Sequence, residues 1–72
     1  MENKQMICDL LLKALQATRE YSDLLNLRYE VPEQPHRYES YVVATFEGGE
    51  RIINTSLDSG SAMIRDILRA LA

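Results

Sequence analysis

The chain has 72 residues, of which 46% are hydrophobic and 26% are charged, which suits one folded domain over residues 1–72 and excludes a disordered tail. Its single cysteine excludes an internal disulfide, and Cys8 and His36 are too few soft ligands for a structural zinc site. The formal net charge of −3 lacks the basic surplus with which nucleic-acid-binding proteins meet phosphate groups.

The first residues of the chain, 1–6, lack the basic run and the long apolar segment of a signal peptide. No stretch of the sequence approaches the roughly 20 apolar residues that a membrane span needs. We therefore expect a cytoplasmic protein that has a reduced thiol and does not associate with membranes.

The first third of the chain predicts one long helix over Asn3–Asn26. Asn3 is a suitable N-cap, and Asn26 can take the left-handed conformation that ends a helix. Neither Pro nor Gly interrupts this segment, and its apolar residues recur at helical spacing: Ile7, Leu10, Leu11, Ala14, Leu15, Ala17, Tyr21, Leu24 and Leu25. Pro32 and Pro35 then predict an irregular connector over Leu27–Arg37.

The middle of the chain predicts a two-stranded antiparallel hairpin. Tyr38–Phe46 and Arg51–Leu57 are rich in β-branched and aromatic residues, and Gly48-Gly49 can form a tight turn between them. Pairing around this turn places Ala44 opposite Ile53. Strand alternation then gives a core face with Val42, Ala44, Phe46, Ile53 and Leu57, and an opposite, partly apolar face with Tyr41, Val43 and Ile52.

The last segment predicts a second helix over Ser59–Leu71. Its apolar stripe consists of Met63, Ile64, Ile67, Leu68 and Leu71. Small residues at a helix start can bind phosphate, but no lysine follows Asp58-Ser59-Gly60-Ser61 as in a Walker loop, and Asp58 repels anions. We therefore interpret this tetrapeptide as a cap. The predicted fold class is α+β, in the order α-β-β-α.

The predicted lengths favour a partner chain. A helix over Asn3–Asn26 is nearly twice as long as the second helix, and one short helix with a hairpin cannot cover all its leucines. We therefore expect a homodimer, formed through the first helix or through the hairpin edge. The predicted interface residues are Leu11, Leu12 and Leu15 on the helix and Tyr41, Val43 and Ile52 on the hairpin. A monomer that exposes some leucines is the alternative.

The sequence contains no set of residues typical of catalysis. Asp9 stands beside Cys8 and disfavours a reactive thiolate, and no Ser-His-Asp arrangement accompanies His36. We expect an inert thiol and a solvated histidine, with no enzymatic activity, cofactor or metal.

No motif in the chain is specific enough to indicate a family, and two classes of function remain. The first is an interaction or regulatory accessory domain that binds a second copy of itself, with another protein as a further candidate partner. The second is a nucleic-acid-associated accessory protein that uses an arginine patch made of Arg37, Arg51, Arg65 and Arg69. The acidic net charge makes the second less favoured.

Overall fold

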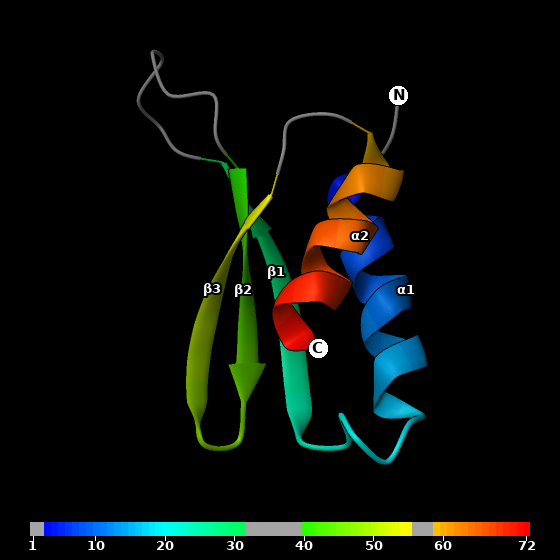
Figure 1. Ribbon diagram of the computed structural model, residues 1–72, viewed down its shortest axis with the longest axis vertical. Coiled ribbons are helices and arrows are strands. Elements are labelled where there is room, and N and C mark those ends of the chain that lie inside the picture. The colour runs from blue at the N-terminus through cyan, green and yellow to red at the C-terminus, as the bar shows by residue number, and fades with distance from the viewer. Residues whose placement is uncertain (1–2, 32–39, 56–58) are drawn as a thin grey trace.

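The computed structural model describes residues 3–31, 40–55 and 59–72. In these ranges two helices and a three-stranded antiparallel sheet follow one another in the order α1, β1, β2, β3, α2 (Figure 1). The predicted α+β class is confirmed, but the predicted α-β-β-α order is wrong, because a further strand lies between the first helix and the hairpin. None of the helices in the described part of the chain combines the length and the apolar character needed to cross a membrane.

Helix α1 spans Lys4–Gln16 and is therefore much shorter than predicted. The expected N-cap is confirmed, because the Asn3 side chain accepts a hydrogen bond of 2.9 Å from the Met6 amide. After Gln16 the backbone turns, and Thr18 donates through both its amide and its hydroxyl to the Leu15 carbonyl. Such side-chain bonds to nearby backbone compete with helix continuation and mark its end.

Strand β1, Leu24–Glu30, occupies the segment predicted to be the end of a helix and the start of a connector. It pairs antiparallel with β2, Ser40–Phe46, and places Leu27 opposite Ala44. Leu25 is an extra residue in this ladder, a β-bulge between Leu24 and Asn26. Leu24 and Leu27 are fully buried, so tertiary packing outweighs the helix propensity of this segment.

Strand β3, Gly49–Thr55, completes the hairpin with β2 and confirms its antiparallel pairing. The register differs by two residues from the predicted one: Val42, not Ala44, lies opposite Ile53, and the turn is Glu47-Gly48. Gly49 has a φ of +147°, which residues with a side chain rarely adopt. Because the shift is an even number of residues, each side chain stays on its predicted face. The predicted strand ends at Tyr38 and Leu57 lie outside the described residues.

Helix α2 spans Gly60–Leu71, in agreement with the predicted second helix. The Ser59 hydroxyl accepts a hydrogen bond from the Ala62 amide, at 3.2 Å, which confirms the capping interpretation. At its other end the Tyr21 hydroxyl donates to the Leu71 carbonyl, at 3.0 Å. This bond ties the turn after α1 to the last turn of α2.

The core lies between the sheet and the two helices. α1 packs mainly on β1 and α2 on β3, and both helices cover the same face of the sheet (Figure 1). The buried hydrophobic cluster draws on every element: Cys8, Leu15, Leu24, Leu27, Val42, Ala44, Ile53, Met63, Ile67 and Leu71. The opposite face of the sheet is not covered by any element of the described chain.

Candidate functional site

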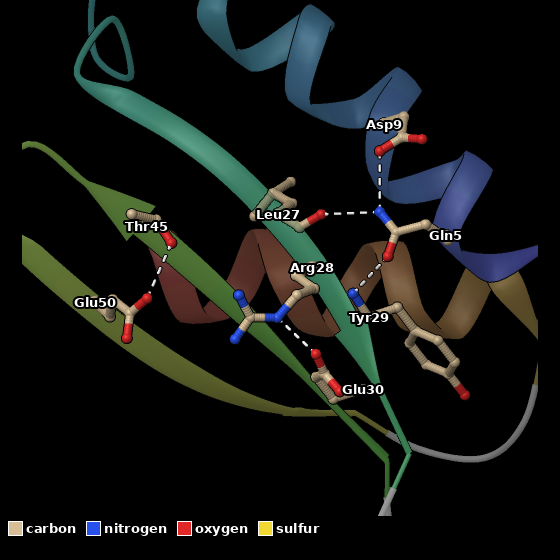
Figure 2. A network of polar contacts seen from close by, with 8 residues as sticks. All are labelled: Gln5, Asp9, Leu27, Arg28, Tyr29, Glu30, Thr45 and Glu50. Carbon is tan, nitrogen blue, oxygen red and sulfur yellow. Dashed lines mark hydrogen bonds and ion pairs between the residues drawn. The ribbon is translucent and has the colours of Figure 1, made fainter.

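The uncovered face of the sheet, hereafter the open face, is arranged by strand pairing into three rows. The middle row contains Arg28, Val43 and Ile52, which are paired across β1, β2 and β3. The outer rows are Asn26–Thr45–Glu50 and Glu30–Tyr41–Asn54. Figure 2 shows Arg28, Glu30, Thr45 and Glu50 on this face, with α2 behind the strands and α1 beside β1.

The centre of the open face is apolar and its surroundings are polar. Val43 is only 5% exposed although no helix covers it, because it lies between the longer side chains of Arg28 and Ile52. Ile52 is 67% exposed, the largest fraction among the exposed large hydrophobic residues in the described chain. Arg28 forms an ion pair with Glu30 along β1, and Thr45 donates to Glu50 at 3.4 Å (Figure 2). An apolar centre within a polar rim is typical of a protein-binding surface.

The outer edge of β1 is closed by a side chain of α1. Gln5 accepts a hydrogen bond from the Tyr29 amide through Oε1, at 2.9 Å, and donates from Nε2 to the Leu27 carbonyl, at 3.2 Å (Figure 2). The same Nε2 donates to Asp9, one helical turn further along α1, at 2.9 Å. The Gln5 amide thus occupies the place of a neighbouring strand and satisfies backbone groups that face away from β2.

A second glutamine and the bulge extend this closure along β1. Gln16, near the other end of α1, donates from Nε2 to the Leu24 carbonyl at 2.9 Å. The bulge at Leu25 breaks the regular ladder between the two glutamine contacts. Native proteins use such bulges and covering elements to prevent the pairing of an edge strand with another chain.

In the described part of the chain the outer edge of β3 has no comparable closure. The two-residue turn makes Phe46 and Gly49 a hydrogen-bonded pair, and alternation along the ladder then turns the backbone N–H and C=O of Glu50, Ile52 and Asn54 away from β2. Within the described residues no side chain or backbone group bonds to them. In Figure 1, β3 forms the side of the sheet remote from α1.

The structure brings the predicted hairpin residues together. Val43 and Ile52 are paired neighbours, and Tyr41, half-buried, stands two residues before Val43 on the same face. Sequence alternation identified this face, but it missed Arg28 and Glu30, because β1 was predicted as helix and connector. It also missed Gln5, which acts on backbone 22 and 24 residues away.

The predicted helix residues lie elsewhere. Leu15 is 7% exposed and belongs to the core, and Leu11 and Leu12 pack against that core. The large apolar side chains that α1 exposes are Met6, at 56%, and Leu10, at 61%. The length mismatch used to predict a dimer rested on a helix to Asn26, so this basis for the dimer is wrong: α1 ends at Gln16, and Leu24 is buried in the sheet.

Within the described chain the predicted arginine residues lie on β3 and α2. Arg51 donates to the Ala70 carbonyl at the end of α2, at 2.9 Å. It lies beside an open hollow of about 410 Å³ that is also lined by the acidic residues Glu20, Asp23 and Glu50. Arg65 and Arg69 are exposed on α2, whereas Arg37 lies outside the described residues. The carboxylates around Arg51 disfavour a phosphate group there.

Cys8 is fully buried. Burial, together with the neighbouring Asp9 carboxylate, raises the pKa of the Cys8 thiol to about 11. Little thiolate therefore exists at neutral pH, and the thiolate is the nucleophile and metal ligand. His36 lies outside the described residues, and within them no three His, Cys, Asp or Glu side chains are placed to hold a metal ion.

The open face and the edge of β3 therefore form the candidate functional site. Comparisons of the chain with protein-family models, with curated proteins and with solved structures give no match.

Proposed function

We propose that the protein is an interaction domain, an accessory or regulatory factor that binds a partner protein by strand addition at β3. An extended segment of the partner pairs with the outward backbone groups of Glu50, Ile52 and Asn54. Its side chains cover Ile52 and the apolar centre of the open face. Main-chain hydrogen bonds supply affinity in this mode of recognition, and alternate side chains supply specificity.

The difference between the two sheet edges carries the proposal. The β1 edge is occupied by the amides of Gln5 and Gln16, while the β3 edge offers backbone groups without partners in the described chain. An exposed strand edge is a template for pairing with another chain, and proteins normally blunt it. The protein blunts one edge. Ile52, the most exposed large apolar side chain among the described residues, stands in the middle of the other.

Site-specific photo-cross-linking in the native host tests this function. A photoreactive phenylalanine analogue at position 52 is expected to capture a protein through one defined peptide, identified by mass spectrometry. The same analogue at Lys13, exposed on α1, is the control and is expected to give no such adduct.

A proline at position 54 separates edge pairing from chance proximity. The Asn54 amide points away from β2, so Asn54→Pro removes an outward donor without breaking the β2–β3 ladder. We expect the variant to fold, as judged by circular dichroism, and to lose the adduct at position 52. Adducts of equal yield at positions 13 and 52, or an adduct insensitive to Asn54→Pro, contradict the proposal.

A further inference from the structure

We infer that the strand added at β3 is the β3 of a second copy of the chain, paired antiparallel about a two-fold axis at Ile52. The inference rests on the proposed function and names its partner. The two three-stranded sheets then join into one sheet of six strands, with both pairs of helices on the same face. The basis is the self-complementarity of β3, residue by residue.

Backbone geometry limits the registers that two β3 strands can adopt. Outward-facing residues must pair with outward-facing residues, so the two-fold axis passes through one residue of β3. Ile52 is the midpoint of Gly49–Thr55, and an axis there pairs the whole strand with its copy. Each outward residue offers one N–H and one C=O to this pairing.

Charge selects the same register. An axis at Glu50 places two carboxylates opposite each other, and an axis at Arg51 does the same with two guanidinium groups. An axis at Ile53 moves Glu50 beyond the end of the second copy's β3. With the axis at Ile52, Glu50 lies opposite the partner's Asn54, whose amide can donate to the carboxylate, and symmetry repeats this pair.

The open face also favours this register. Ile52 lies opposite the partner's Ile52, so each covers the side chain that is the most exposed large apolar one in the described part of the other copy. Within each copy Ile52 is paired with the nearly buried Val43. The join therefore makes a continuous apolar row of Val43, Ile52 and the same two side chains of the partner. Cross-strand pairs of β-branched residues stabilise antiparallel sheets.

Cysteine pairs test the register directly. Cross-strand hydrogen-bonded residues have Cα atoms about 5.5 Å apart, within the disulfide range of roughly 4.4–6.8 Å. We expect Ile52→Cys to form a covalent dimer alone, and Glu50→Cys to do so only when mixed with Asn54→Cys. The matched controls are Glu50→Cys and Asn54→Cys, each alone, because equivalent positions are then about 13 Å apart along the strand. Native Cys8 can remain, since it is buried.

Charge variants at position 54 test the inference without new cysteines. Asn54→Lys places a cation opposite the partner's Glu50, and Asn54→Glu places an anion there. The side chain of Asn54 is exposed in the single chain, so both variants should fold. Two such pairs per dimer should strengthen association about two- to thirtyfold for Lys and weaken it by a similar factor for Glu. Sedimentation equilibrium measures both dissociation constants.

The outcomes separate this inference from the proposed function. A monomer at all concentrations, with a different protein still captured at position 52, overturns the self-pairing and leaves strand addition intact. A dimer that cross-links through Glu50→Cys alone, or one unaffected by both charge variants, overturns the register. A dimer with the expected cysteine pattern and opposite responses to Lys and Glu supports it.

Discussion

Among individual residues of the described chain, a pair of hydroxyl groups and one thiol lie buried in the interior. The hydroxyls of Ser40 and Thr55 face each other across β2 and β3 at 2.9 Å, and both residues are buried. Each satisfies the other, so neither leaves an unpaired polar atom in the core. The Cys8 thiol instead stays neutral, because burial and the Asp9 carboxylate disfavour its charged form.

The hydroxyl pair leads to a prediction about stability. Ser40→Ala leaves the Thr55 hydroxyl buried without its partner, so the free energy of unfolding should fall by about 1–3 kcal/mol. Adding Thr55→Val removes the second hydroxyl, and the double variant should recover part of this loss. Urea denaturation measures both values. A double variant less stable than Ser40→Ala alone would show that the hydroxyls are not coupled.

The thiol leads to a prediction about pH. Its pKa rises from an ordinary value of 9.0 to about 11 in the folded protein, so below pH 9 the thiol is protonated in both the folded and the unfolded state. Above pH 9 the unfolded state releases the proton while the folded state keeps it. The free energy of unfolding should therefore fall by roughly 2–3 kcal/mol between pH 9 and pH 11. Because other groups titrate there, the measurement is the difference between the native chain and Cys8→Ala in denaturant unfolding from pH 8 to 11. An identical slope for both chains would contradict the assignment.

At the scale of elements, β1 shows where sequence periodicity misleads. Leu24 and Leu27 are both buried and stand three residues apart, a spacing typical of a helix. They share one face of a strand because the bulge at Leu25 adds a residue between them. A bulged strand thus imitates helical spacing. The regular strands β2 and β3 keep strict alternation, and their faces were predicted correctly even though the turn was displaced.

The contact between α1 and β1 predicts the effect of a conservative change at Gln5. Gln5→Glu keeps an acceptor for the Tyr29 amide but loses the donors to the Leu27 carbonyl and to Asp9, and adds a like charge beside Asp9. The free energy of unfolding should fall by about 1–3 kcal/mol. Gln16→Glu loses a single donor bond and is the matched comparison, with a smaller expected loss. Equal losses in urea unfolding would show that the β1 edge is not held mainly by Gln5.

At the scale of the whole molecule, sequence patterns located the hairpin side of the candidate site but not its boundaries. Tyr41, Val43 and Ile52 follow from alternation within one hairpin. The closure of β1 depends on contacts between α1 and a strand more than 20 residues away, which local patterns do not encode. The dimer thus remains a prediction. Its physical basis is no longer an excess of apolar helix but the edge of β3, which has no partner in the described chain.

Self-association predicts that stability depends on protein concentration. If two copies pair through β3, only the folded chain gains from association, so the thermal midpoint should rise with concentration. Asn54→Pro should have a midpoint that is independent of concentration, because the outward Asn54 donor is gone. Scanning calorimetry over a hundredfold concentration range measures both. A native midpoint that does not move over this range would contradict a dimer.

If two copies pair through β3, the Gln5 amide also determines how far the assembly can grow. A sheet with two open sides can recruit copies without limit and propagate into a filament. Because Gln5 occupies the edge of β1, each chain then has one open sheet edge in its described part, and pairing with one other copy occupies that edge. If two copies pair through β3, the glutamine that stabilises β1 within one chain also limits the assembly to a dimer, and its removal would allow growth into a fibre.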